Sequence, residues 1–423
     1  MQQLPADHAP APGTATPGAP TPGTATPGTP TAGAASAAAP RPVQLGMPSL
    51  PSAQPAARSS VPGGPDTHGA DPARGLMDSF GRRATDLRIS LIDKCNLRCT
   101  YCMPAEGLPW LSKDQLLSAE EIRRLVHIGV NTLGVRELRL TGGEPLVRAD
   151  LVEIIAALRA DHPDLPIAMT TNAIGLERKA AALAEAGLTR VNISLDSVHR
   201  ETFAQLTRRD SLEKVLTGVE AAAAAGLTPL KINAVLMRGI NDVHAADLLD
   251  WSLQRGFELR FIEQMPLDGD QQWNSAGTVS AAETRALLSE RFVLSPTQEN
   301  RDGAPAERFD VYPLGTSPDS IRIGEQGPPL GRVGVIASVT EPFCADCRRT
   351  RLTAEGRVMS CLFSNEEFDL MHLLRAPGTT DDEIAQAWAE AMWLKPAAHG
   401  TDRPGFDLAS FHRPDRSMSA IGG

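Results

Sequence analysis

Six cysteines carry the clearest chemical signal in this 423-residue sequence. So few cysteines in so long a chain do not form a disulfide scaffold. They fall into two triplets, with the spacings C-x3-C-x2-C and C-x2-C-x13-C: Cys95, Cys99 and Cys102, then Cys344, Cys347 and Cys361. Thiolates grouped in this way are typical ligands of metal ions and iron–sulfur clusters.

The number of ligands in each triplet separates two kinds of site. A structural zinc ion usually takes four protein ligands, and no fourth Cys or His lies close to the first triplet. Three thiolates suit a [4Fe–4S] cluster that leaves one iron open for a small molecule. For the second triplet, His372 is the nearest later candidate for a fourth ligand, so a zinc module stays open as an alternative there.

The first cysteine loop resembles the signature of the radical S-adenosylmethionine (SAM) superfamily, including an aromatic residue before its last cysteine. In that superfamily, the open iron binds the amino and carboxylate groups of SAM, whose reductive cleavage yields a 5′-deoxyadenosyl radical. A Gly-rich turn, Thr141–Pro145, strengthens the resemblance, since glycine permits a close approach of backbone to ligand. The resemblance implies cofactor contacts at Tyr101, Gly143, Glu144, Ser194 and Met265.

Cations are placed where they suit an anionic ligand. Arg349 and Arg351 follow the second cysteine pair, and other basic residues lie in expected strands. Most Lys and Arg make ordinary solvent contacts or salt bridges. Guanidinium groups, however, bind phosphate in a bidentate manner, so convergence of these cations on one cavity predicts a polyphosphate site.

Together these features resemble the GTP 3′,8-cyclase family over roughly residues 80–423, including Thr170–Asn172, Lys231 and the terminal Gly422-Gly423. The resemblance implies a lyase reaction that converts GTP to (8S)-3′,8-cyclo-7,8-dihydroguanosine 5′-triphosphate, the first step of molybdenum cofactor biosynthesis. It implies two [4Fe–4S] clusters and SAM as cofactors, with the guanine held by the open iron of the second cluster.

The same resemblance assigns substrate and catalytic roles. The residues expected to contact GTP are Arg88, Arg139, Thr170, Lys231, Arg260, Arg349 and Arg351. Arg349 and Arg351 are also expected to be catalytic, as are Gly422 and Gly423, whose tail inserts toward the active site in the family. Two positions depart from the family pattern. Ala173 stands where relatives usually have Gly, and Glu137 where some have Lys, which puts one phosphate contact in doubt.

The elements that must position these residues begin near Asp86, where strands alternate with helices. The expected strands are Leu87–Ile92, Val135–Leu140, Ile167–Thr170, Arg190–Leu195, Pro229–Leu236 and Glu258–Glu263. Ser118 and Asp150 are expected to cap two of the helices between them. The pattern predicts an α/β fold, an incomplete (βα)6 TIM-like barrel with its chemistry at the carboxyl ends of the strands.

Three domains are expected. Residues 1–75 are rich in Pro, Ala, Thr and Gly, repeat the hexamer GTATPG at Gly13–Gly18 and Gly23–Gly28, and are predicted to form a disordered tail. Residues 76–268 form the radical SAM partial barrel. Residues 269–423 form a smaller C-terminal domain with the second cluster and the Gly-Gly tail.

The charge and hydropathy of the sequence exclude several classes of binding partner and predict a location. A net charge of -10 argues against a nucleic-acid or membrane-surface binder. There is no apolar run of ~18 residues and no secretory signal, so a cytoplasmic location is expected. The resemblance implies an electron donor such as flavodoxin or ferredoxin, transfer of the product to cyclic pyranopterin monophosphate synthase, and a homodimer.

Two other functions stay open: a radical SAM enzyme that modifies a peptide, and a zinc-binding regulatory protein.

Overall fold

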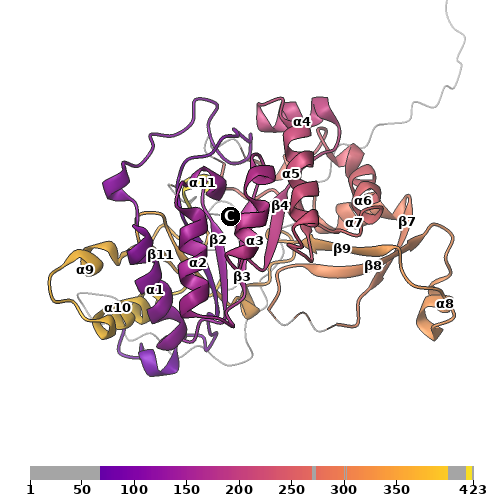
Figure 1. Cartoon of the computed structure of the whole chain (residues 1–423). Helices are drawn as coiled ribbons and strands as arrows, with labels where there is room; N and C mark the ends of the chain where they lie inside the picture. Colours follow the sequence, from indigo (N-terminus) through magenta and orange to yellow (C-terminus); the bar gives the residue numbers. More distant parts are fainter. Residues whose placement is uncertain (1–66, 269–272, 300, 302, 399–415, 422–423) are drawn as a thin grey trace, which may run out of the picture. The chain divides into compact units, whose positions relative to one another are not determined.

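Six parallel strands run in chain order through the centre of the structure, a computed structural model (Figure 1). It describes residues 67–268, 273–299, 301, 303–398 and 416–421. The six strands are β1 (Asp86–Ser90), β2 (Glu137–Thr141), β3 (Ile167–Thr171), β4 (Arg190–Ser194), β5 (Lys231–Leu236) and β6 (Glu258–Glu263). The expected α/β class is confirmed, and the expected strands are present with ends that differ by up to two residues.

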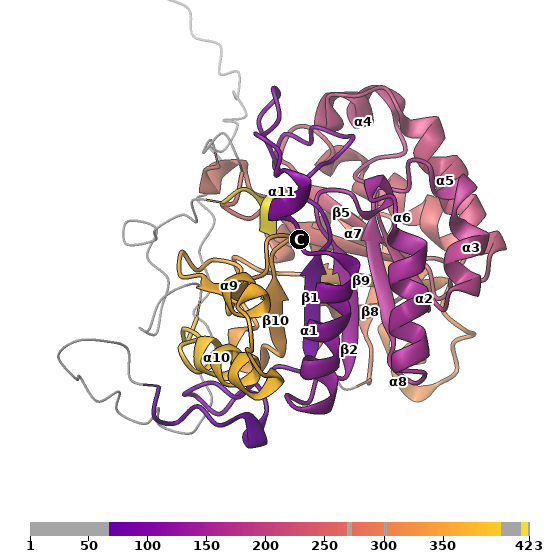
Figure 2. The ribbon, with the colours of Figure 1, turned by 60° about the vertical axis from the view of Figure 1, so that its left-hand side comes forward.

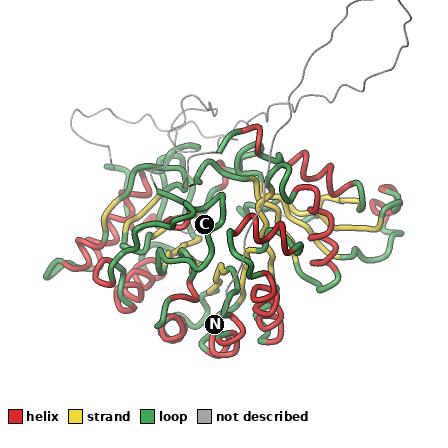
Figure 3. The backbone as a smooth tube through the Cα atoms, turned by 90° about the horizontal axis from the view of Figure 1, so that it is seen from above, coloured by secondary structure: helices red, strands yellow, loops and turns green. Residues whose placement is uncertain are grey.

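Helices connect these strands and cover one face of the sheet. They are α1 (Ala119–Asn131), α2 (Leu151–Asp161), α3 (Ala180–Glu185), α4 (Arg200–Thr207), α5 (Leu212–Ala224) and α6 (Ala245–Leu253). Short 3-10 turns are η1 (Pro72–Arg74), η2 (Lys113–Gln115), η3 (Pro145–Val147), η4 (Leu176–Arg178), η5 (Asp242–His244), η6 (Ser275–Gly277) and η7 (Cys344–Asp346). Seen from above, the helices lie along the outer side of the strands (Figure 3).

Both residues expected to cap helices stand at N-cap positions, and the side chain of Ser118 makes the capping hydrogen bonds. Ser118 forms a capping box with Glu121 at the start of α1, which satisfies backbone donors that the first turn leaves unpaired. The prediction for Asp150 was wrong in its hydrogen bond. Asp150 stands at the start of α2, but its carboxylate accepts from Nε of Arg148 at 2.8 Å and makes no capping bond. A guanidinium two residues away competes successfully for the same oxygen atoms.

Strands from the C-terminal part of the chain extend the same sheet at both edges, in the order β12-β11-β10-β1-β2-β3-β4-β5-β6-β9-β8-β7. At one edge lie β9 (Gly331–Ile336), parallel to β6, then β8 (Glu307–Pro313) and β7 (Phe292–Pro296). At the other lie β10 (Arg349–Leu352), parallel to β1, then β11 (Arg357–Met359) and β12 (Phe368–Asp369). The boundary expected at residue 268 stays a prediction.

The remaining helices accompany these outer strands. They are α7 (Ala281–Ser289), α8 (Pro318–Ile323), α9 (Met371–Arg375), α10 (Asp381–Trp393) and α11 (Met418–Ile421). Figure 2 shows α9 and α10 beside β10, and α1 in front of β1 and β2. Every helix among the residues that the structure describes is too short or too polar to span a lipid bilayer.

The two faces of the sheet differ in chemistry because alternate residues of a strand point to opposite faces. On β1 and β2 the outward residues are apolar and at most 1% exposed, and they pack under the helices: Leu87, Ile89, Leu138 and Leu140. The residues between them face inward, and Arg88 pairs in register with Arg139. The apolar face anchors the helices, while the polar face is left for a charged ligand.

Candidate active site

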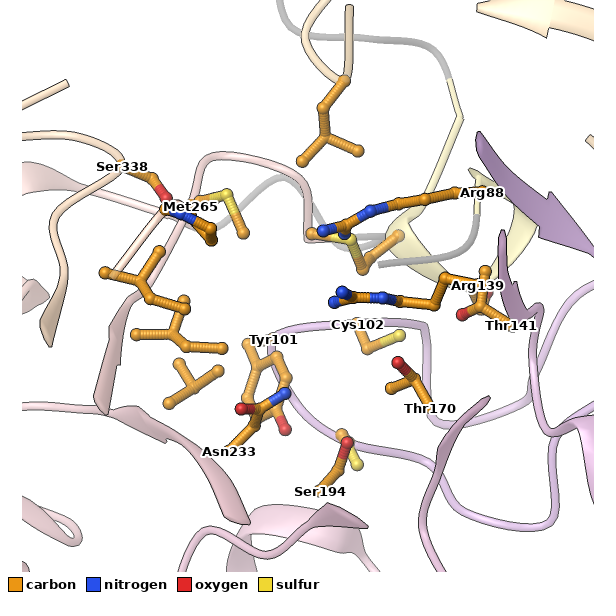
Figure 4. Close-up of a pocket in the computed structure, with 18 of the residues that line it drawn as sticks. Arg88, Tyr101, Cys102, Arg139, Thr141, Thr170, Ser194, Asn233, Met265 and Ser338 are labelled. Atoms are coloured by element: carbon orange, nitrogen blue, oxygen red, sulfur yellow. The ribbon is translucent and has the colours of Figure 1, made fainter. Parts of the chain in front are cut away.

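A single cavity on the inner side of the sheet brings the two cysteine triplets together, although they are far apart in the sequence. All six cysteines line it, as do most residues predicted to bind cofactor or substrate: Arg88, Tyr101, Arg139, Gly143, Glu144, Thr170, Ser194, Arg260, Met265, Arg349 and Arg351. Figure 4 shows the side chains of Arg88 and Arg139 extending into this space side by side. Of the predicted residues that are described, Lys231 is the one that does not line the cavity.

The first triplet lies on the loop that follows β1. Nη1 of Arg98 donates a 2.8 Å hydrogen bond to the carbonyl oxygen of Cys95, and Nδ2 of Asn172 lies 3.8 Å from its Sγ. Burial raises the pKa of Cys95 to about 11 and that of Cys102 to about 12. Because metal ligands must be deprotonated, assembly of a cluster here releases protons.

The Gly-rich turn after β2 packs directly against this cysteine loop. A Cβ on Gly143 would lie 2.4 Å from the carbonyl oxygens of both Asp93 and Lys94, so only glycine fits. The carboxylate of the next residue, Glu144, accepts hydrogen bonds from N of Asn172 at 2.7 Å and from N of Leu146 at 3.0 Å. Burial raises the pKa of Glu144 to about 7. Through its hydrogen bonds to Asn172 and Leu146, Glu144 positions the neighbouring loops in addition to lining the cavity.

Tyr101 is held by a buried carboxylate that sequence reasoning did not single out. Its hydroxyl donates a 2.7 Å hydrogen bond to Oδ2 of Asp196, while Oδ1 of Asp196 accepts from N of Val235 at 2.8 Å. Burial raises the pKa of Asp196 to about 6. Asp196 lies two residues after Ser194, and both line the cavity. Because residues two apart in an extended chain point to the same side, the predicted role of Ser194 could have indicated Asp196 as well.

The second triplet occupies a different electrostatic environment. Cys344 is the first residue of η7, and Cys347 follows η7 two residues before β10 begins. Burial favours the neutral thiol of Cys347, but the charges of Lys395 and Arg349 outweigh burial and lower its pKa to about 6. The pKa of Cys347 is therefore shifted in the opposite direction to the pKa values of Cys95 and Cys102 in the first triplet.

Arginines from neighbouring strands form the basic part of the cavity. Arg88 on β1 pairs in register with Arg139 on β2 and with Arg351 on β10. Burial, followed by the charge of Arg349, lowers the pKa of Arg351 to about 10 and also lowers that of Arg88. Within the described residues, Nε of Arg88 and Nε of Arg139 are buried without a hydrogen-bond partner. A polyanion bound here would relieve the repulsion and supply acceptors.

Lys231 and Arg260 share one carboxylate, Glu258. Nε of Arg260 lies 2.7 Å from Oε1 of Glu258, and Nζ of Lys231 lies 3.6 Å from Oε2. Lys231 is the first residue of β5 and therefore lies at the amino end of its strand. Burial, followed by the charge of Arg260, lowers the pKa of Lys231 to about 8. Its contact with substrate stays a prediction.

The C-terminal segment reaches the cavity. Met418 and Ser419 on α11 line it, and Ser419 hydrogen-bonds to Cys102. Arg416 fastens this segment through ion pairs with Glu355 and Glu367. The predicted catalytic residues Gly422 and Gly423 lie outside the described residues, so their role stays a prediction.

The two departures from the family pattern have visible local consequences. Ala173 is buried and adopts a left-handed backbone conformation with φ of 64°, which normally favours glycine. Glu137 is exposed at the start of β2 and lies 3.4 Å from Nη2 of Arg190. Glu137 thus neutralises a cation at the amino end of the sheet.

Two asparagines of the inner face were also missed. Asn233 lines the cavity two residues after Lys231, and Asn192 pairs in register with both Thr170 and Lys231. In the described part of the chain, Oδ1 of Asn233 and both side-chain polar atoms of Asn192 are buried without hydrogen-bond partners. Buried polar atoms are usually paired, so the amide of Asn233 in the cavity wall indicates a polar ligand.

The donor sets of both triplets fit iron–sulfur clusters better than single zinc ions. Zinc–sulfur bonds of ~2.3 Å place sulfur atoms about 3.8 Å apart around one tetrahedral ion. Over the described ranges, one group of at least three His, Cys, Asp or Glu ligand atoms lies within 4.8 Å, and it contains no cysteine: His199, His244 and Asp247. His372, the alternative fourth ligand, is exposed and does not line the cavity.

A parallel βα core whose cavity holds a C-x3-C-x2-C triplet defines a radical SAM protein. Residues 89–252 match the model of the Radical SAM superfamily, and residues 257–401 match that of Molybdenum Cofactor Synthesis C. A curated relative from Paenarthrobacter nicotinovorans, named GTP 3′,8-cyclase, is 65% identical over 82% of this chain and 97% of its own. The chain belongs to the GTP 3′,8-cyclase family. SAM and an iron–sulfur cluster are therefore its cofactors.

A second curated relative agrees with this family membership, and one solved structure shares the fold. A second relative named GTP 3′,8-cyclase, from Rhodococcus opacus (strain B4), is 55% identical over 82% of this chain and 93% of its own. Among solved structures, Streptococcus suis SuiB bound to its precursor peptide SuiA has a TM-score of 0.51 at 14% identity, covering 74% of this chain and 66% of that one. That likeness shows the fold alone.

Proposed function

We propose that this protein converts GTP to (8S)-3′,8-cyclo-7,8-dihydroguanosine 5′-triphosphate, the first step of molybdenum cofactor biosynthesis. One observation carries the proposal: both cysteine triplets and a group of buried and half-buried arginines line the same cavity. A cofactor at one triplet and a nucleotide at the other are thereby brought within reach of each other. Proximity of this kind makes a reactive species selective.

The first triplet and its neighbours form the cofactor half of the site. Cys95, Cys99 and Cys102 hold the first cluster. When bound, SAM and this cluster would supply a 5′-deoxyadenosyl radical, which in this family removes hydrogen from C3′ of GTP. C3′ then joins C8 of guanine, and one electron from the electron donor with one proton completes the dihydro product. The chain's task is to orient SAM, and the residues proposed for it are Tyr101, Gly143, Glu144, Ser194 and Met265.

The second triplet and the cations form the substrate half. We propose that Cys344, Cys347 and Cys361 hold a second [4Fe–4S] cluster, whose open iron binds the guanine. The triphosphate lies among the basic residues and Thr170, where the buried Nε–H groups of Arg88 and Arg139 have no hydrogen-bond partner within the described residues. Arg349 and Arg351 are also proposed to be catalytic, together with Gly422 and Gly423. The position of Met418 and Ser419 in the cavity wall supports a role for the tail.

Further partners are proposed from family membership alone. A flavodoxin or ferredoxin would supply electrons, cyclic pyranopterin monophosphate synthase would receive the product, and two copies of the chain would form a dimer. A cytoplasmic location is proposed on the same basis.

The experiment combines metal analysis with a product assay. Protein purified and reconstituted without oxygen is analysed for iron, sulfide and zinc, and two four-iron clusters predict about eight irons per chain. The protein is then incubated with SAM, a reductant and either GTP or a candidate peptide, and products are identified by mass spectrometry. Consumption of GTP with formation of the cyclised nucleotide is expected. Zinc in both triplets, or modification of peptide but not of GTP, would contradict the proposal.

A further inference from the structure

A lysine that takes no part in the predicted substrate site lies against the second triplet. Lys395 follows α10 and is 3% exposed. Its Nζ donates to Sγ of Cys347 at 3.3 Å and to the carbonyl oxygen of Arg349 at 2.8 Å. One ammonium group therefore joins a cluster ligand to the backbone of a proposed catalytic arginine.

The segment that carries Lys395 is fixed from a second direction. Nη1 of Arg82 donates to the carbonyl oxygens of Cys344 at 2.9 Å and Ala397 at 2.8 Å, and Nη2 donates to that of Pro396 at 2.6 Å. Nε of Arg82 is itself held by Asp78 at 2.5 Å. The backbone beside Lys395 and the loop of the second triplet are thus clamped to the same guanidinium, which restricts the positions that Lys395 can take.

A buried ammonium is costly unless it is paired and hydrogen-bonded. The acceptors of Lys395 are the sulfur of Cys347 and the carbonyl oxygens of Cys347 and Arg349. A cluster bound through Cys347 would supply the negative charge that makes burial of this ammonium favourable. Hydrogen bonds and positive charge at a ligand sulfur withdraw electron density from the cluster and thereby raise its reduction potential. The same bond holds the start of β10, from which Arg349 and Arg351 extend.

We propose that Lys395 is a positioning residue for the second cluster: its ammonium hydrogen-bonds to the ligand sulfur of Cys347, raises the reduction potential of that cluster and holds the start of β10 beside it. The inference rests on the proposed function, because it requires a cluster at the second triplet. It identifies Lys395, which is not a cluster ligand, as a residue that influences the second cluster.

The test compares Lys395→Met and Lys395→Arg in the full chain with both clusters reconstituted. Redox titration followed by electron paramagnetic resonance gives the midpoint potential, and a background with Cys95, Cys99 and Cys102 replaced by Ala isolates the second cluster. Lys395→Met is expected to shift that midpoint to more negative values. Lys395→Arg retains the charge and the donors, and is expected to return the midpoint toward the wild-type value.

A matched control removes a lysine that binds carbonyl groups but no cysteine. Nζ of Lys179 donates to the carbonyl oxygens of Leu146 at 3.0 Å and Arg148 at 3.4 Å. Lys179→Met is expected to leave the midpoint of the second cluster unchanged. An equal shift in this control would show a general effect of losing a lysine and would overturn the inference.

The remaining outcomes of this test also support or overturn the role of Lys395. Loss of iron from the second triplet in Lys395→Met, restored in Lys395→Arg, supports a positioning role. Full iron content with an unchanged midpoint in Lys395→Met overturns it. Wild-type protein that assembles no second cluster contradicts the proposed function itself, which distinguishes the two failures.

Discussion

The backbone N–H of Gly143 donates a 2.6 Å hydrogen bond to the carbonyl oxygen of Ile92, so the turn after β2 and the first cysteine loop are joined through backbone alone. Gly142 beside it adopts φ of 141°, and a Cβ there would lie 2.3 Å from the same carbonyl oxygen. The double glycine is therefore needed for contact within the protein, before any ligand is considered.

Replacing Gly143 by Ala is expected to remove the first cluster. The added methyl would overlap the carbonyl oxygens of Asp93 and Lys94, directly before Cys95, and backbone cannot move aside without displacing that ligand. Iron content should fall from about eight to about four per chain, with loss of SAM cleavage. Gly327→Ala, where the new methyl meets nothing within 4 Å, is the control. Retention of all iron in Gly143→Ala would disprove this account.

Arg349→Ala and Arg351→Ala are expected to abolish cyclisation while leaving iron content intact. Each change removes a cation from the anion site, and loss of one such donor typically reduces turnover about 100-fold or more. Product formation and iron content are measured together. Arg200→Ala removes an exposed arginine paired with Asp210 at 2.7 Å and should turn over normally. Full turnover by both cavity variants would refute the anion-site argument.

GTP binding is expected to weaken as pH rises past about 8, because burial and Arg260 lower the pKa of Lys231 to about 8. Loss of this charge should reduce affinity about tenfold, a typical value for one charge-assisted hydrogen bond. Calorimetric titration with GTP from about pH 7 to about pH 9.5 measures the effect. Lys231→Arg, always charged, should abolish this pH dependence. An identical profile in wild type and Lys231→Arg would show that Lys231 does not contact the substrate.

The same pKa shift predicts the sign of a stability effect. The pKa of Lys231 is lowered from 10.5 to about 8 in the folded protein, so burying its charged form costs stability below about pH 8. That cost is removed as pH rises from about 8 toward 10.5. In Lys231→Met, the corresponding rise in the free energy of unfolding should be missing from the pH profile.

Arg416→Ala is expected to release the C-terminal segment from the cavity. Arg416 pairs with Glu355 and Glu367, and Met418 and Ser419 just beyond it line the site. Turnover should fall about tenfold or more, because misplacement of a catalytic segment by even ~1 Å is costly. Iron content and GTP affinity should stay unchanged. Arg375→Ala, which removes an arginine paired with Glu121, is the control. Normal turnover in Arg416→Ala would exclude a role for this anchor.

Much of the fold and the ligand set could be predicted from the sequence because the signals are local. Alternation of apolar and polar residues marked β6 at Glu258–Glu263 with its observed bounds, and Ser118 with Glu121 marked the start of α1. The cysteine spacing and the Gly-rich turn identified the superfamily. Local patterns of this kind depend on the period of a strand, the unpaired donors of a helix end and the steric freedom of glycine.

Only the tertiary structure decided which distant residues meet. It placed β10 beside β1, so that Arg351 faces Arg88, and it brought Lys395 to Cys347. It also showed that Asp150 binds Arg148 instead of capping α2. Contacts between segments far apart in the chain depend on how the apolar faces pack and on which buried charges find partners, and neither is written in the spacing of residues along one strand or loop.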